Sequence, residues 1–283
     1  MSFFEIFLLL AVLGFFIGFI SGLVGMGGGI LFVPTFWFIF PLLKIKPELV
    51  VKSAVATSSA CMTITTFTSA YHHLKTGYLN KEIFKNLLLG AIPGVILGAS
   101  LTSLFLPPHF VKICFSLFLI VMAYRMLKGG KKKKETYKIK NEKHISNAKA
   151  NSKIKIILIG MLAGILAGML GAGGGALITP MLYNFCNVPI KEAMATNTGV
   201  VFLSSLVSTL SYIFFGIKNT DLPYFLGYIY LPALVFMIPF LIVGTKLGIK
   251  IMYKSHPDRL RKIFAFILVL VSINVIYKTI FRG

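Results

Sequence analysis

The sequence predicts an all-α polytopic membrane protein built from two related repeats, and three observations support this prediction. Of the 283 residues, 57% are hydrophobic and only 13% are charged, about half the charged share of an ordinary soluble domain. The apolar residues gather in segments, several of which reach the ~20 residues that a membrane crossing needs. The second half of the chain repeats the motifs of the first half in the same order. We therefore expect about 8–10 transmembrane helices.

Each repeat contains five apolar segments. Most of them lack the polar face of a surface helix, as expected for helices surrounded by lipid and protein. The second segment of each repeat is short and is bounded or interrupted by prolines. We expect a broken or half-length helix there, and whether it crosses the membrane stays open. The segments are 3–24, 30–43, 50–74, 84–106 and 109–128 in the first repeat, and 154–171, 176–187, 192–216, 222–253 and 259–280 in the second.

A lysine-rich linker, residues 129–153, joins the two membrane repeats, which occupy residues 1–128 and 154–283. Because cytoplasmic loops of membrane proteins collect Lys and Arg, we expect this linker on the cytoplasmic side of the plasma membrane. The linker lacks the interleaved aromatic residues of an RNA-binding arm, so we expect no nucleic-acid partner. The expected partners are membrane lipid and a small anionic substrate, and self-association into a homo-oligomer stays open.

Corresponding loops of the two repeats carry opposite charge bias. Between the third and fourth segments the first repeat has three lysines, whereas the second has Lys218 offset by Asp221. Between the fourth and fifth segments the first repeat has only Lys112, whereas the second has six basic residues. This pattern favours repeats of inverted topology. The alternative is parallel repeats in which the second segments are re-entrant. Lys44, Lys46 and Lys52, around the connection between the second and third segments, favour this alternative, because the inverted arrangement would place their loop outside.

A glycine-rich loop follows the first segment of each repeat. GLVGMGGGILFVP at residues 22–34 matches GMLGAGGGALITP at residues 168–180 at an offset of 146. Consecutive glycines disfavour a regular helix, and glycine lets backbone N–H groups face an anion where a helix begins. Close helix packing is the alternative role, and it is the one we expect for Gly14, Gly18 and Gly22, which are spaced by four. The predicted substrate-binding glycines are Gly25, Gly27, Gly28, Gly29, Gly171, Gly173, Gly174 and Gly175.

A polar sequence begins the third segment of each repeat. KSAVATSS at residues 52–59 matches KEAMATNT at residues 191–198, at an offset of 139. Hydroxyl and amide groups can donate hydrogen bonds to a small oxyanion without burying a charge, although they also bond to helix backbone. We predict that Thr57, Ser58, Thr196 and Asn197 contribute to substrate binding. A stripe of Ser and Thr continues along both segments: Thr63, Thr65, Thr66, Thr68 and Ser69, and Ser204, Ser205, Ser208 and Thr209.

The acids, cysteines and histidines narrow the function classes. All eight acids lie at segment ends or in loops, which disfavours a carrier of metal cations, and we expect neither a metal site nor a cofactor. The sequence offers no acid–base pair or nucleophile set, so we expect no enzyme. Cys61, Cys114 and Cys186 are expected to pack as small hydrophobes. His72 and His73, unmatched in the second repeat, are candidates for a proton relay, with an interfacial role as the alternative.

The duplicated set of motifs resembles the TauE/SafE-like family of sulfite exporters, also called the four-toluene sulfonate uptake family. The set consists of the GxxGxGGGxxxxP loop, the KxAxAT sequence and a PxxxxG helix, the last at Pro93 with Gly98 and at Pro239 with Gly244. The resemblance implies a plasma-membrane carrier of small sulfur-containing anions such as sulfite, sulfoacetate or other organosulfonates, moved without ATP. It places the family's glycine motif and polar segment on the substrate-binding residues predicted above. We expect alternating access between the repeats, with a passive anion channel or a non-transport assembly subunit as alternatives.

Overall fold

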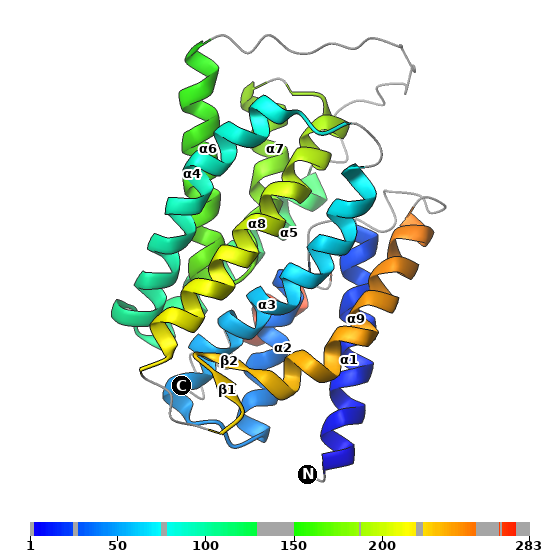
Figure 1. Cartoon of the computed structure of the whole chain (residues 1–283), viewed down its shortest axis with the longest axis vertical. Coiled ribbons are helices and arrows are strands. Elements are labelled where there is room, and N and C mark those ends of the chain that lie inside the picture. The colour runs from blue at the N-terminus through cyan, green and yellow to red at the C-terminus, as the bar shows by residue number, and fades with distance from the viewer. Residues whose placement is uncertain are drawn as a thin grey trace.

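In a computed structural model of the chain, the residues that the structure describes are almost entirely helical (Figure 1). The structure describes residues 3–24, 28–74, 78–128, 150–186, 188–218, 223–252, 266 and 268–275. Within these ranges the only strands are two of two residues each, which pair in antiparallel fashion. This confirms the prediction of an all-α fold.

All five apolar segments of the first repeat form helices. The fourth helix begins at Asn80, whose side-chain oxygen accepts hydrogen bonds from the backbone N–H groups of Glu82 and Ile83. A π-helical turn, η1 (Leu101–Phe105), extends that helix to the loop before the fifth. The helices are α1 (Phe3–Val24), α2 (Gly29–Leu42), α3 (Pro47–Leu74), α4 (Lys81–Ser100) and α5 (Pro108–Lys128).

The second repeat follows the same order, with one difference from the prediction. The fourth apolar segment, expected to be continuous from residue 222, begins with a β-hairpin that turns at Gly227, where φ is +59°. In the predicted fifth segment, the described residues 266 and 268–275 are helical. The elements are α6 (Ala150–Leu170), α7 (Gly175–Cys186), α8 (Ile190–Gly216), β1 (Phe225–Leu226), β2 (Ile229–Tyr230) and α9 (Leu231–Met252).

Six helices of the described residues are long and apolar enough to cross a membrane: α1, α3, α4 with η1, α6, α8 and α9. Two further apolar helices, α2 and the stretch Pro108–Tyr124 of α5, are shorter. Large apolar side chains such as Phe16, Leu97 and Phe214 are exposed on the outer surface, where a bilayer would cover them. The chain is thus a multi-pass membrane protein. The second helices of the repeats have 14 and 12 residues, in agreement with the predicted half length.

The first helix of each repeat packs along the fourth helix of the other repeat, α1 on α9 and α6 on α4. Glycines spaced by four allow the close approach. A Cβ on Gly18 of α1 would lie 2.6 Å from the carbonyl oxygen of Leu241, and one on Gly164 of α6 would lie 2.3 Å from that of Ala91. The predicted packing role of Gly14, Gly18 and Gly22 is confirmed, since all three face α9.

These contacts place the fourth helices of the repeats in a register that differs from the sequence prediction. Gly94 of α4 lies against the carbonyl of Met161, and Gly244 of α9 lies against that of Phe15. The two partner residues, Phe15 and Met161, are 146 residues apart, which is the offset of the first helices. The glycines that contact them, Gly94 and Gly244, are 150 residues apart. The first residues of α4 and α9 are also 150 residues apart. The sequence prediction pairs the two PxxxxG motifs at an offset of 146. This differs by four residues, about one helical turn, from the offset of 150 that relates α4 to α9 in the structure. A two-residue motif cannot fix the register when the preceding loop changes length.

The third helices of the repeats, α3 and α8, run side by side and in opposite directions at the centre of the molecule (Figure 1). Ser59 of α3 contacts Ser208 of α8 through their hydroxyl oxygens at 3.0 Å. Further along α3, the ring of Phe67 lies 5.4 Å from that of Phe202. The residue numbers rise along α3 while their partners fall along α8, so the two helices are antiparallel.

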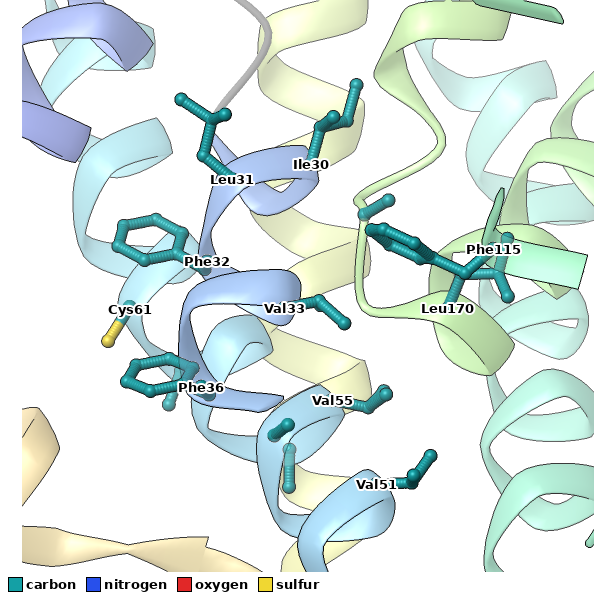
Figure 2. Packing of buried hydrophobic residues seen from close by; sticks show 14 of the residues in the cluster. Ile30, Leu31, Phe32, Val33, Phe36, Val51, Val55, Cys61, Phe115 and Leu170 are labelled. Atoms are coloured by element: carbon teal, nitrogen blue, oxygen red, sulfur yellow. The ribbon is translucent and has the colours of Figure 1, made fainter. Parts of the chain in front are cut away.

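The short helix α2 is embedded in the protein. Figure 2 shows Phe32 and Phe36 on the side of α2 near Cys61 of α3, while Val33 points the other way, as does the neighbouring Ile30. The two phenylalanines and Cys61 are fully buried. Packing on both sides holds the beginning of α2 in a fixed position, and this position is where the candidate site lies.

Candidate functional site

Both short helices begin after a glycine with a left-handed backbone. Gly28, before α2, has φ +75°, and Gly174, before α7, has φ +62°. The carbonyl oxygen of Gly28 accepts a hydrogen bond from the N–H of Leu31 at 2.9 Å, and that of Gly174 accepts one from Leu177 at 3.0 Å. Glycine adopts these angles without strain, which explains its presence at both positions. The first N–H groups of each helix have no acceptor within the helix and carry its positive dipole end.

The glycine loops of the two repeats meet around Met62 of α3. A Cβ on Gly29 would lie 2.6 Å from the carbonyl oxygen of Gly171 and 2.7 Å from the Met62 Sδ. A Cβ on Gly173 would lie 2.5 Å from the Met62 Cε. The backbone at the start of α2 therefore touches the loop that leads into α7, so the predicted substrate-binding glycines Gly29, Gly171 and Gly173 lie close together.

Val201 of α8 occupies the place in the second repeat that Met62 occupies in the first. The two residues are 139 apart, which is the offset of the third segments. A Cβ on Gly175, the first residue of α7, would lie 2.6 Å from the Val201 Cγ2. Each half-length helix thus begins against an apolar side chain of its own third helix. Sequence reasoning missed both side chains, because buried Met and Val are ordinary in an apolar segment.

Ser58 and Asn197, two predicted site residues, hold carbonyl groups of the second glycine loop. The Ser58 hydroxyl donates to the Gly171 carbonyl at 2.9 Å, and the Asn197 Nδ2 donates to the Gly175 carbonyl at 3.0 Å. Their exposed fractions are 0% and 3%. The Asn197 Oδ1 is buried and has no hydrogen-bond partner in the described structure. Ser58 thus lies at the end of α6 and Asn197 at the start of α7, both beside the second glycine loop, while their contact with a substrate stays a prediction.

Thr57 and Thr196 make a different, matched pair of contacts. The Thr57 Oγ1 accepts a hydrogen bond from the backbone N–H of Tyr230 at 3.1 Å, and the Thr196 Oγ1 accepts one from that of Asn80 at 3.2 Å. Each N–H stands directly before the fourth helix of the other repeat. We call these two hydrogen bonds the threonine latches. They lie toward opposite ends of the molecule, where α9 and α4 begin (Figure 1).

The surroundings of the threonine latches are largely buried. Thr57 and Thr196 are both fully buried. Burial raises the pKa of the Tyr230 phenol, with a smaller contribution from Tyr224, so this side chain stays neutral at ordinary pH. The donor residues Tyr230 and Asn80 are half-buried, so each latch is a partly buried hydrogen bond between uncharged groups.

Side chains from several helices satisfy the carbonyl groups at the end of α6. The Tyr212 hydroxyl donates to the Gly168 carbonyl at 2.7 Å, and the Thr102 hydroxyl donates to the Met169 carbonyl at 3.0 Å. With Ser58 on Gly171, three of the terminal carbonyls have side-chain donors. Sequence reasoning missed Tyr212 and Thr102. A signal existed for Tyr212, a polar-tipped aromatic residue among aliphatic and hydroxyl side chains.

Lys52 is the first residue of the first KxAxAT sequence. Its side chain lies next to the residues that surround the end of α6. Its Nζ donates to the Ser103 carbonyl at 2.7 Å and lies 5.6 Å from the centroid of the Tyr228 ring. The Tyr228 ring packs edge-on against Tyr212, with centroids 6.5 Å apart. The lysine charge is thus engaged by a carbonyl dipole and an aromatic face.

A line of hydroxyl groups joins α3 and α8 where they lie side by side. Besides the contact between Ser59 and Ser208, the Thr63 hydroxyl donates to Ser205 at 3.1 Å and lies 3.4 Å from the Thr209 oxygen. We call these five residues the hydroxyl seam. The polar stripe expected from the sequence is therefore, in this part, a direct contact between the two repeats.

Several predicted residues lie outside the described structure. Gly25 and Gly27 precede α2, and most of the linker 129–153 also falls outside the described ranges. His72 and His73 belong to α3, but their side chains are not described, so the proton relay stays a prediction. Among the described residues no Asp or Glu is buried.

The three cysteines are free thiols. Cys61 is fully buried, whereas Cys114 and Cys186 are partly buried and pack against the two apolar clusters of the core. These positions agree with the expected packing role.

Comparison with known proteins identifies relatives along nearly the whole chain. The family described as sulfite exporter TauE/SafE matches residues 10–275. A probable membrane transporter protein of Methanocaldococcus jannaschii is 34% identical over 266 residues, covering 92% of this chain and 91% of the relative. Probable membrane transporter proteins of Haemophilus influenzae and Bacillus subtilis are 29% and 27% identical, each covering 97% of this chain and 100% and 99% of the relative. No solved structure matches. The chain therefore belongs to the sulfite exporter TauE/SafE family.

Proposed function

We propose that this protein is a secondary transporter of small sulfur-containing anions such as sulfite, sulfoacetate or other organosulfonates. Membership of the TauE/SafE family and the names of the relatives support a membrane transporter. The observation that carries the proposal is the meeting of two half-length helices, one from each repeat, whose glycine-rich beginnings touch. Secondary transporters use paired discontinuous helices of this kind to bind anionic groups.

An oxyanion between these helix beginnings would be held by neutral donors. The free N–H groups of α2 and α7 carry the positive ends of the helix dipoles, each worth up to ~2 kcal/mol to an anion in a partly buried setting. Asn197 can add the second N–H of its Nδ2, beyond the one that it donates to the Gly175 carbonyl. No buried carboxylate of the described residues would oppose a negative substrate. The arrangement suits a sulfo group better than a metal cation.

The two repeats have inverted topology in this proposal, with the linker on the cytoplasmic side. The antiparallel arrangement of α3 and α8 supports inversion, because corresponding helices of parallel repeats would run in the same direction. The opposite charge bias of corresponding loops supports it independently. The exchange of first and fourth helices between repeats, with matched glycine contacts, agrees with a two-fold relation.

Alternating access would use contacts that the two repeats share. The threonine latches hold the fourth helices toward opposite ends of the molecule, so releasing one latch while keeping the other would open the site to one side at a time. Hydroxyl groups of the hydroxyl seam can exchange donor and acceptor roles, which would allow α3 and α8 to shift without leaving a charge unpaired. Export of a monovalent anion gains ~2.3 kcal/mol per 100 mV, inside negative.

Flux measured in proteoliposomes tests the proposal. The purified protein is reconstituted with radiolabelled sulfite inside, with and without an imposed potential or pH gradient, and challenged with unlabelled sulfoacetate, sulfate and chloride. Saturable flux that sulfoacetate competes with, and chloride does not, is the expected result. Flux that never saturates would indicate a passive anion channel. Absence of flux with any sulfur anion would withdraw the substrate class and leave a non-transport assembly subunit as the function to test.

A further inference from the structure

A pocket of about 290 Å³ lies between α2, α3, α5 and the helical residues 268–275, and it shares no residue with the glycine loops. We call it the Trp37 pocket. Besides two prolines, its lining consists of Trp37, Phe38, Ile45, Val50, Lys112 and Val275.

The Trp37 pocket combines an apolar wall with one charged hydrogen-bond donor, the side chain of Lys112. Of the described residues that line it, Lys112 alone is charged, and this side chain is half-buried. The Trp37 ring is fixed edge-on against Phe115, with centroids 5.0 Å apart. A ligand with an apolar part and an anionic, hydrogen-bond-accepting part complements this lining.

The surroundings of the pocket are apolar and face the membrane. Phe38 on its lining is 36% exposed, and Leu42 and Ile113, next to the lining residues Pro41 and Lys112, are 62% and 49% exposed. Acyl chains of the bilayer would cover such side chains.

Positive charge is in excess where α2 ends. Lys44 and Lys46 are exposed in the short connection to α3, and Glu48 in the first turn of α3 is the acid nearest to them in sequence. Together with Lys112 and with Lys52, which interacts with Glu48, four lysines of the described residues stand against this one acid. Basic pockets between transmembrane helices at the membrane surface bind anionic lipid headgroups.

We propose that the Trp37 pocket binds an anionic phospholipid, with the phosphate on Lys112 and the upper part of an acyl chain along Trp37, Ile45 and Val50. The volume is at the small end of the ~300–1,000 Å³ of typical ligand sites, so it holds only part of a lipid. The remaining chain lies along Leu42 and Ile113. This inference does not depend on the proposed transport function.

Fluorescence of Trp37 reports directly on the pocket, because it is the only tryptophan of the chain. The full-length protein is reconstituted in phosphatidylcholine vesicles. One series of vesicles contains increasing fractions of phosphatidylglycerol with brominated acyl chains, and the other contains increasing fractions of phosphatidylcholine with brominated acyl chains. Bromine quenches tryptophan fluorescence on contact. We expect brominated phosphatidylglycerol to quench at about fivefold lower mole fraction, the ratio that one lysine near an anionic headgroup provides. Equal quenching by the two lipids would overturn the proposal.

Variants of Lys112 identify the source of the preference. Lys112→Gln should abolish the preference for phosphatidylglycerol, while Lys112→Arg should keep it and shows that the fold tolerates substitution. Lys85→Gln is the matched control, because Lys85 is exposed near the start of α4, at the opposite end of the molecule from the end of α2 (Figure 1). A preference that survives Lys112→Gln contradicts the assignment. If a soluble alkyl sulfonate removes the quenching by brominated phosphatidylglycerol, the ligand of the pocket is a water-soluble amphiphilic anion and the lipid proposal is overturned.

Discussion

Individual glycines of the loops have different physical roles, which their backbone angles and neighbours distinguish. Gly28 and Gly174 adopt positive φ angles that an L side chain rarely adopts, whereas Gly29 has no positive φ but lies against the opposite loop. Any side chain at Gly28 or Gly174 would strain the backbone, whereas a side chain at Gly29 would collide with the opposite loop. Both kinds keep the helix N–H groups close to the centre of the molecule.

Substituting Gly174 with alanine should destabilise the protein. The left-handed backbone costs an L-residue ~1–2 kcal/mol. In addition, the new Cβ would lie 2.3 Å from the carbonyl oxygen of Ala163, so the backbone must shift. We expect a lower melting temperature of the purified protein in detergent, measured by thermal unfolding.

Gly199→Ala is the control for this substitution. Gly199 lies within α8, and the nearest atom to its added Cβ is the end of the Phe84 ring at 3.0 Å, which can move. Alanine is favoured over glycine in a helix by up to ~1 kcal/mol. The melting temperature should therefore hold or rise. Equal destabilisation by both substitutions would argue against the role of backbone strain at Gly174.

The threonine latches give a second prediction at the residue scale. Thr57→Val and Thr196→Val each remove the acceptor of a half-buried backbone N–H, at a cost of ~0.5–1.5 kcal/mol. Thr57→Ser and Thr196→Ser restore the acceptor and should restore the melting temperature. Valine variants as stable as the wild type would mean that the latches contribute nothing.

Transport measurements on the same variants test the predicted contact of Thr57 and Thr196 with substrate. The double valine variant should raise the half-saturation concentration for sulfite in proteoliposomes beyond any loss of folded protein. The serine variants, which keep the hydroxyl groups, serve as the reference. Unchanged half-saturation in the double valine variant would assign these threonines to structure alone.

At the scale of the elements, the fold depends on helices that contact each other backbone to backbone across the repeats. In α1 and α9, and in α6 and α4, glycines lie opposite main-chain carbonyls at distances that leave no room for a Cβ. Helices in a membrane gain little from the hydrophobic effect between them, so close van der Waals contact must hold them together.

Gly94→Leu should separate α4 from α6 and prevent normal assembly. The added Cβ alone would lie 2.5 Å from the Met161 carbonyl oxygen, and the remaining side-chain atoms have no space. Gly244→Leu should have the same effect in α9, where the Cβ would lie 2.3 Å from the Phe15 carbonyl oxygen. Size-exclusion chromatography in detergent should show loss of the monodisperse peak for both variants.

Leu97→Phe is the control on the same helix. Leu97 is nearly half exposed and faces the surroundings of α4, so a larger apolar side chain there meets lipid or detergent. Its elution profile should match that of the wild type. A normal profile for Gly94→Leu would contradict the tight packing of α4 on α6.

At the scale of the whole molecule, inversion of the repeats can be tested by the sidedness of corresponding loops. Single cysteines replace Lys85, near the start of α4, and Lys218, after α8, in a chain whose three native cysteines are alanine. Both lysines are exposed: Lys85 lies in the second turn of α4, just after the connection from α3, and Lys218 lies in the connection that follows α8. Inverted repeats predict that an impermeant maleimide labels Lys218→Cys in intact cells but labels Lys85→Cys only after permeabilisation. Labelling of both from the same side would favour parallel repeats.

The cysteine-free chain is informative in itself. Cys61 is buried among apolar side chains, and all three thiols are free. We expect sulfite flux in proteoliposomes to be unchanged when all three become alanine, apart from a modest loss of stability at Cys61. Loss of flux in well-folded protein would instead indicate a thiol-dependent function, such as sulfur relay.

The sequence alone determined the membrane class, the helical segments and the position of the glycine loops, because apolar length and repeated local motifs are properties of neighbouring residues. It also placed Ser58 and Asn197 beside those loops. It did not reveal Met62 between the loops.

Only the tertiary structure decided which elements meet. It decided the pairing of first and fourth helices across the repeats, and with it the register offset of 150. It also decided the backbone partners of Thr57 and Thr196. All of these contacts join residues that are far apart in the chain. Apolar periodicity is the same for any partner helix in a membrane, so it cannot specify a partner. The partner is specified by backbone approach at individual glycines and by single hydrogen bonds, which exist only once the chain is folded.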